Sequence, residues 1–138
     1  MTRIGVLTLP WSGHLNPFAA LALELEQRGN EVLFFHLPEF ADRFASRGLS
    51  FRDYATERFP ALTFARRDSE LSRLKGEEAV AHALESTRLW GEALLREGRQ
   101  TLTQSEVDLF LVDHLDYAAS ILVRKLGIPF VSVITTLM

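Results

Sequence analysis

Apolar residues gather in five short runs along the chain, and stretches of helical spacing separate these runs. The runs are rich in Val, Ile, Leu and Phe, which is typical of strands buried on both faces of a parallel sheet. Between the first two runs, apolar residues repeat every three to four positions, as in an amphipathic helix. The pattern predicts strands over residues 3–9, 31–37, 49–54, 108–112 and 129–135.

Proline and glycine mark the expected ends of the first helices. Asn16 is placed to cap the first helix with Pro17 at its first position, where a missing N–H is harmless. Gly29 supplies the end of that helix. Pro38 opens a second helix, which Gly48 ends. Each apolar run is thus followed by a segment that returns the chain to the start of the next.

The later part of the chain continues the alternation of strands and helices. Ala55 to Ser105 is charged and helical in pattern, with a break at Gly76, and we expect Asp116 to cap a last helix. This order predicts an α/β fold with a doubly wound, Rossmann-like parallel sheet. Right-handed crossovers favour the strand order 3-2-1-4-5, with a switch point between the first and fourth strands.

Two polar loops are expected to meet at this switch point, where doubly wound sheets bind their ligands. They are residues 10–16 and 113–116, and they bring His14 towards Asp113. A carboxylate beside an imidazole fixes its tautomer and stabilises the imidazolium, so His14 is a candidate general base that Asp113 supports. A helix N-terminus nearby disfavours the imidazolium. On the residues alone, His14 can also be an ordinary turn residue, and Asp113 can simply cap the next helix.

The other histidines do not suggest a metal site. His36 lies inside an apolar run and is expected in the core, His82 lies on a charged helix, and His114 follows a strand in a loop. No two of them have the spacing of metal ligands on one helix or strand. The sequence also lacks a dinucleotide-binding G-x-G-x-x-G, a P-loop and a G-x-S-x-G nucleophile motif.

Composition narrows the class of protein further. The 138 residues suffice for one domain with a real core, and a net charge of -3 argues against a nucleic-acid partner. The chain has no cysteine, which fits a reducing cytoplasm. The apolar run at the amino terminus is too short for a signal peptide or a membrane span.

Two segments carry a resemblance to a known family. GHLNPFAALALELEQRGNEVLFF (residues 13–35) resembles the start of family 1 glycosyltransferases, the UDP-glycosyltransferase-like enzymes, and especially their bacterial macrolide and carotenoid branch. VDLFLVDHLDYAASILVRKLGIPFVSV (residues 107–133) is similar to a later segment of that family. Asn30 departs from the family's usual histidine, and residues 55–105 match only in character.

The resemblance implies the amino-terminal half of a GT-B fold, in which two Rossmann-like domains enclose the active site. The family's catalytic histidine falls on His14, and its supporting aspartate falls on Asp113. These residues would remove the proton from an acceptor hydroxyl during an inverting transfer from a nucleotide sugar, expected to be a UDP-sugar. The family requires neither a metal nor another cofactor.

The resemblance also implies that the chain is incomplete. Residues 1–138 would form the acceptor-binding domain, while the donor-binding domain is missing, because the chain stops soon after the fifth strand. We therefore expect no sugar transfer by this chain alone. The unpaired edge of the last strand favours self-association.

Aromatic residues indicate the kind of acceptor, a lipophilic hydroxylated small molecule. Its binding is predicted to involve Trp11, Phe59, Phe64, Trp90 and His114. The aromatic residues among them can equally well pack helices onto the sheet.

Ser12 and Gly13 are candidates for the approach of the donor phosphates, since a glycine near a helix N-terminus lets the backbone come close to an anion. Two other functions remain open. One is a non-catalytic Rossmann-like module that binds a ligand or partner. The other is a small flavodoxin-like nucleotide-binding protein, for which the sequence lacks a phosphate-binding loop.

Overall fold

The structure is a computed structural model that describes residues 1–54 and 63–135. Its centre is a parallel sheet with the strand order β3-β2-β1-β4-β5, which confirms the predicted fold class and order. The first and fourth strands are neighbours, so the switch point lies between them. The strands are β1 (Arg3–Leu7), β2 (Glu31–His36), β3 (Ser50–Asp53), β4 (Leu109–Asp113) and β5 (Phe130–Val133).

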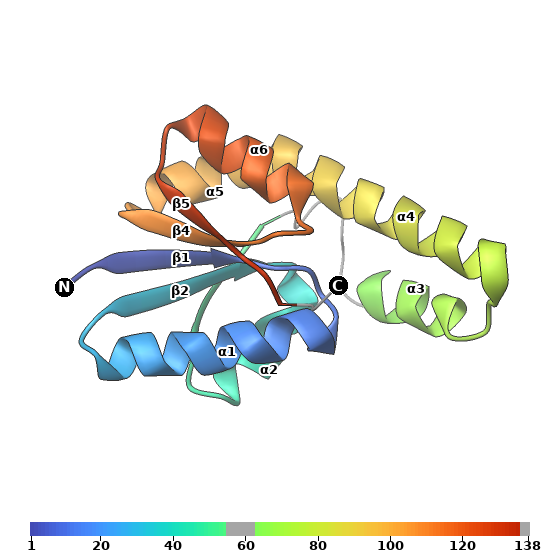
Figure 1. Cartoon of the computed structure of the whole chain (residues 1–138), viewed down its shortest axis with the longest axis horizontal. Coiled ribbons are helices and arrows are strands. Elements are labelled where there is room, and N and C mark those ends of the chain that lie inside the picture. Colours follow the sequence, from blue (N-terminus) through green and yellow to red (C-terminus); the bar gives the residue numbers. More distant parts are fainter. Residues whose placement is uncertain (55–62, 136–138) are drawn as a thin grey trace.

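Helices cover both faces of the sheet (Figure 1). In the figure, α1 and α2 lie on one face and α5 and α6 on the other, while α3 and α4 extend past the carboxyl ends of the strands. None of the described helices is both long and apolar enough to cross a membrane. Their bounds are α1 (Ser12–Gln27), α2 (Ala41–Ala45), α3 (Thr63–Leu71), α4 (Gly76–Ala93), α5 (Arg99–Gln104) and α6 (Tyr117–Leu126). A 3₁₀ turn (Pro38–Phe40) precedes α2, and a π-helical turn (Leu94–Gly98) joins α4 to α5.

Helix α1 begins earlier than the sequence predicted, and Asn16 does not cap it. The carbonyl of Trp11 accepts hydrogen bonds from the backbone N–H groups of His14 and Leu15, both at 2.9 Å. Pro17 therefore lies inside the helix, still near its start, where its missing N–H leaves only one carbonyl without its helical partner. Asn16 instead accepts a side-chain hydrogen bond from Arg47. As a consequence, His14 belongs to the first turn of a helix and not to a loop.

Gly5 leaves space in the sheet for the side chain of Phe110 in the neighbouring strand. It pairs with Phe110 across β1 and β4, and a Cβ atom on Gly5 would lie 2.3 Å from the Phe110 ring. The glycine thus makes room for a fully buried aromatic ring in the middle of the sheet.

Helix α6 begins and ends as the sequence predicts. The side chain of Asp116 accepts a hydrogen bond of 2.9 Å from the N–H of Ala119, which confirms its capping role. Gly127 ends the helix in the left-handed conformation, with φ of 70°. This cap fixes the loop between β4 and α6, which follows Asp113 and carries His114.

Candidate active site

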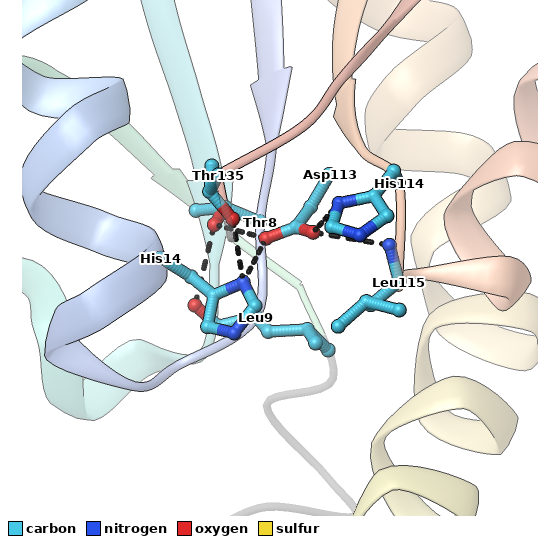
Figure 2. Close-up of polar contacts among 7 residues, drawn as sticks. All are labelled: Thr8, Leu9, His14, Asp113, His114, Leu115 and Thr135. Carbon is cyan, nitrogen blue, oxygen red and sulfur yellow. Dashed lines mark hydrogen bonds and ion pairs between the residues drawn. The ribbon is translucent and has the colours of Figure 1, made fainter. Parts of the chain in front are cut away.

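His14 and Asp113 meet at the switch point of the sheet. Asp113 is the last residue of β4 and is fully buried, and His14 is 8% exposed in the first turn of α1. Because β1 and β4 are neighbours, the turn that follows β1 passes over the end of β4. The Nδ1 atom of His14 lies 2.6 Å from Oδ2 of Asp113, a short hydrogen bond (Figure 2).

Neighbouring groups hold the Asp113 carboxylate in place. Its Oδ1 accepts from the backbone N–H of Leu115 at 3.1 Å, and the Thr8 hydroxyl donates to Oδ2 at 3.3 Å. A carboxylate only accepts hydrogen bonds, so the shared hydrogen belongs to Nδ1 of His14. The Oγ1 atom of Thr135 lies 3.0 Å from the same nitrogen. This arrangement leaves Nε2 of His14 with a lone pair, the state that a general base requires.

His114 lies on the opposite side of Asp113 from His14 (Figure 2). Its Nδ1 is 3.5 Å from Oδ1 of Asp113, and within the described residues neither ring nitrogen has a hydrogen-bond partner. Asp113 therefore has an imidazole on each side. His114 does not line the apolar cavity near this site, so its contact with an acceptor stays a prediction.

A cavity of about 420 Å³ lies near this pair, although neither His14 nor Asp113 is among the residues that line it. Its wall comes from the loop after β1, the end of β2, α4 with the following turn, and α6, and it is mainly apolar, with Leu9, Leu37, Leu94 and Ile121 among its side chains. Thr8 lines the cavity and also contacts Asp113, so the cavity begins next to the histidine–aspartate pair. Its size and character suit a small apolar ligand.

The predicted aromatic residues have different places. Trp90 is buried and lines the cavity. The Trp11 ring packs edge-on against Trp90, with centroids 5.1 Å apart, and lies 6.2 Å from the His14 ring. Phe64 contacts Trp90 from the other side, at 5.5 Å between centroids. Phe59 lies outside the described residues. Trp11 and Phe64 thus pack against the side chain of Trp90, which forms part of the cavity wall.

Several polar residues in the cavity wall escaped the sequence analysis as ligand contacts, and the buried ones among them include His36, Tyr54 and Asp116. His36 is buried, as expected of a core histidine, and burial lowers its pKa to about 3, against a smaller opposing effect of the Thr8 carbonyl. Burial also raises the pKa of Tyr54. His36 ends β2, and the rule that ligands bind at the carboxyl ends of strands was the signal that could have identified it.

Asp116 is buried as well, and its carboxyl is less acidic than usual. Burial raises its pKa to about 6, the hydrogen bond from Ala119 opposes this shift, and the charge of Asp113 adds to it. His36 and Asp116 therefore both favour their neutral forms compared with solvent-exposed residues of the same type.

Ser12 and Gly13 lie exposed at the start of α1. The Ser12 hydroxyl accepts a hydrogen bond of 3.0 Å from Arg43, and Gly13 has open space where a side chain would be. A role in approaching the donor phosphates stays a prediction. Within residues 1–54 and 63–135, no three histidine, aspartate or glutamate side chains gather in a way that could hold a metal ion.

Comparison with known proteins shows which class of protein this chain resembles. No family model matches the chain. The chain is nevertheless glycosyltransferase-like, because the relatives and solved structures that it resembles are glycosyltransferases. This confirms the predicted resemblance to family 1 glycosyltransferases and to part of their GT-B fold.

Particular relatives show how far the similarity extends. Zeaxanthin glucosyltransferase from Pantoea ananas is 26% identical over 133 residues, which are 96% of this chain and 31% of that protein. The structure of the kitacinnamycin glycosyltransferase has a TM-score of 0.64 at 26% identity and covers 97% of this chain and 30% of its own. For SsfS6 from Streptomyces sp. SF2575, the TM-score is 0.72 at 20% identity, with coverage of 96% and 38%. The chain thus spans about a third of the length of the proteins that it matches.

Proposed function

We propose that this chain is the acceptor-binding domain of an inverting glycosyltransferase and supplies its catalytic base. The reaction moves a sugar from a nucleotide sugar to a hydroxyl of a lipophilic small molecule. The observation that carries the proposal is the 2.6 Å hydrogen bond between His14 and Asp113 beside an apolar cavity. The similarity to glycosyltransferases supplies the reaction class.

In the proposed step, Nε2 of His14 accepts the proton of the acceptor hydroxyl. The hydroxyl oxygen forms a bond to the anomeric carbon as the bond from that carbon to the phosphate oxygen breaks, and the nucleoside diphosphate leaves. Attack opposite to the leaving group inverts the anomeric configuration, so an α-linked donor gives a β-linked product. Asp113 stabilises the imidazolium that His14 becomes.

The apolar wall of the cavity supports a lipophilic acceptor. Residues such as Leu9, Leu37 and Trp90 lose contact with water when such a molecule binds, which favours binding without any charged recognition group. Thr8 lines the cavity and its hydroxyl contacts Asp113, the partner of His14. We therefore propose that the reacting hydroxyl of the ligand lies at this end of the cavity.

The donor nucleotide is predicted to be UDP. The structure of SsfS6 is described as a complex with thymidine diphosphate, however, so both nucleotides belong in the test. The choice between the two nucleotides reports on the donor site. The His14–Asp113 pair acts on the acceptor, so its role is expected to be the same with either nucleotide.

The test uses the longest open reading frame that contains this chain, incubated with UDP- or thymidine diphosphate-glucose and a set of apolar phenols and alcohols. We expect a β-glucoside, identified by the proton coupling of its anomeric carbon in NMR. Residues 1–138 alone should form no product. A product with retained configuration contradicts the proposed mechanism, and ligand binding without any transfer indicates the non-catalytic binding module instead.

A further inference from the structure

Asp116 is a buried carboxylate with one oxygen left open in the wall of the cavity. The residue is 9% exposed, and it lines the cavity among mainly apolar side chains. Its Oδ1 accepts a hydrogen bond of 2.9 Å from the N–H of Ala119. Within the described residues its Oδ2 accepts no hydrogen bond, yet Oδ2 is not one of the fully enclosed polar atoms, so it keeps accessible surface. Asp116 therefore presents an unpaired oxygen to a molecule in the cavity.

A buried carboxylate is usually paired with a cation, because the loss of water otherwise disfavours its charged form. Burial raises the pKa of Asp116 to about 6, and the negative charge of Asp113 adds to this shift. Arg88 is the one lysine or arginine in the described part of the cavity wall, and it pairs with Glu85 and Glu92. A positive charge beside Oδ2 of Asp116 would compensate both for the lost water and for the repulsion by Asp113.

The other ionisable groups in the described part of the wall do not supply that charge. Burial lowers the pKa of His36 to about 3, so its ring is uncharged at physiological pH. Burial raises the pKa of Tyr54, so its phenol is uncharged as well. The charged side chains that remain are Arg88, Glu92 and Asp116. One positive and two negative groups leave the wall with a net negative charge once Asp116 is ionised.

Aromatic side chains of the wall add to the attraction for a cation. Tyr54, Trp90 and Tyr117 line the cavity, and Tyr117 directly follows Asp116 in the chain. The ring faces of tryptophan and tyrosine attract ammonium groups, most strongly where water is excluded. An unpaired carboxylate among aromatic side chains is thus complementary to an ammonium group.

We propose that the cavity binds an apolar ligand that carries a positively charged amine, and that this amine pairs with Oδ2 of Asp116. The apolar wall binds the body of the ligand, and the carboxylate adds a preference for a cation. That this ligand is also the sugar acceptor rests on the proposed function. The amine is then a second polar group, separate from the hydroxyl that receives the sugar.

A matched set of ligands tests this preference by binding alone. The ammonium ligand, 6-(trimethylammoniomethyl)-2-naphthol, carries a hydroxyl and a permanent positive charge on an apolar ring system. In the neopentyl ligand, 6-neopentyl-2-naphthol, a carbon atom replaces the nitrogen, which keeps the shape and removes the charge. The carboxylate ligand, 6-(carboxymethyl)-2-naphthol, carries a negative charge instead. Equilibrium dialysis against the 138-residue chain measures their dissociation constants between about pH 5 and about pH 8.

The ionisation of Asp116 should control the binding of the ammonium ligand. The pKa of Asp116 is about 6, so its carboxyl is largely neutral at about pH 5 and ionised at about pH 8. We expect the ammonium ligand to bind about 10-fold more tightly at the higher pH, because its own charge does not change. The affinity of the neopentyl ligand should change by less than about twofold, and at about pH 8 the carboxylate ligand should bind more weakly than either.

Variants show whether Asp116 causes the pH dependence. Asp116→Asn and Asp116→Ser both keep a helix-capping residue and remove the charge. We expect each to lower the affinity for the ammonium ligand about 10-fold at about pH 8 and to abolish its pH dependence, with binding of the neopentyl ligand unchanged. Asp68→Asn on α3, outside the described cavity wall, is the matched control and should leave the pH dependence unchanged. His14 and His114, on either side of Asp113, stay in every variant, so an effect of their protonation would persist in Asp116→Asn.

Binding of the ammonium ligand that does not vary with pH overturns the proposal. So does the absence of measurable binding of that ligand, a pH dependence that persists in both Asp116 variants, or binding of the carboxylate ligand as tight as that of the ammonium ligand at about pH 8. The ligand series with the unchanged chain decides the question even if the variants do not fold.

The two proposals fail in different ways. Sugar transfer to the neopentyl ligand by the longest open reading frame, together with pH-independent binding of the ammonium ligand, overturns only the role of Asp116. The expected pH-dependent binding, without sugar transfer to any of the three ligands, overturns only the proposed function.

Discussion

Two histidines and two aspartates lie at the same edge of the sheet, and only one histidine and one aspartate are partners of each other. His14 and Asp113 are joined by a 2.6 Å hydrogen bond. His36 and Asp116 both line the neighbouring cavity, but their hydrogen bonds go to the backbone, to Leu37 and Ala119.

The difference shows that the partner of a residue, and not its type, determines its chemistry. In the first pair the carboxylate directs the imidazole hydrogen to Nδ1 and leaves Nε2 as a base. In the second, burial dominates and lowers the pKa of His36 to about 3 while it raises that of Asp116 to about 6. The first arrangement is suited to proton transfer, whereas the second leaves two buried residues that favour their neutral forms.

The largest expected effect is that of removing the base. In the longest open reading frame that contains this chain, His14→Ala should reduce kcat of the proposed sugar transfer by about 10⁴-fold, at the upper end of what general-base catalysis contributes. His82→Ala is the matched control, because its ring lies against Arg67 on α3, and it should change kcat by less than about twofold. A His14→Ala enzyme that retains most of its turnover would show that the first pair does not transfer the proton.

Asp113→Asn tests the carboxylate while preserving its shape. The amide presents either an oxygen or an NH₂ group to Nδ1, so it neither fixes the tautomer as firmly nor stabilises the imidazolium. We expect kcat to fall by about 10³-fold, within the range that general acid–base catalysis contributes, with the binding of apolar ligands preserved in equilibrium dialysis. Loss of ligand binding with an unchanged kcat would assign Asp113 to the cavity instead of the base.

Asp116→Asn should increase the stability of the folded chain. The pKa of Asp116 in the folded chain is about 6, compared with an ordinary 3.8, so the folded state retains a proton that the unfolded chain has lost. The stability that the folded chain gains from holding this proton is complete below pH 3.8 and disappears as the pH rises through about 6. Asparagine caps helices as well as aspartate does and carries no charge. The variant should therefore gain up to about 3 kcal/mol in the free energy of unfolding near neutral pH.

Urea unfolding of Asp116→Asn and the original chain at a series of pH values checks this gain. The difference between the two should shrink to near zero at about pH 4. A constant difference over the whole range would mean that the ionisation of Asp116 is not its cause.

Thr135→Val should have the smallest effect. The Thr135 hydroxyl lies 3.0 Å from Nδ1 of His14, which already donates to Asp113, so its removal costs one secondary contact. We expect kcat to fall about fivefold, equivalent to about 1 kcal/mol, with the same product configuration. A loss as large as that of Asp113→Asn would place Thr135 on a level with the carboxylate in orienting His14.

The sequence was sufficient to predict the fold class and the strand order, because the apolar runs and right-handed crossovers leave few arrangements for a chain of this size. It misplaced the start of α1, since Asn16 and Pro17 form a strong local capping signal. Winding the helix from Ser12 buries Leu15 and most of His14, and this packing outweighs the preference for a cap. The local sequence pattern around Asn16 does not show how much apolar surface is buried when the helix starts earlier.

The candidate site was predictable only in part. The strand order places the loop with His14 beside the end of β4, so the approach of His14 to Asp113 followed from topology. The buried indole N–H of Trp90, which has no partner among the described residues, did not, because whether a buried N–H finds an acceptor depends on every element that packs around it.

The tautomers of the two histidines test the central claim most directly. Long-range ¹H–¹⁵N correlation spectra of the ¹⁵N-labelled chain at about pH 8 distinguish a protonated from an unprotonated imidazole nitrogen. The structure predicts hydrogen on Nδ1 of His14, which faces Asp113, and on Nε2 of His36, whose Nδ1 faces the Leu37 N–H. Hydrogen on Nε2 of His14 would contradict the account, because that nitrogen would then have no lone pair with which to accept a proton.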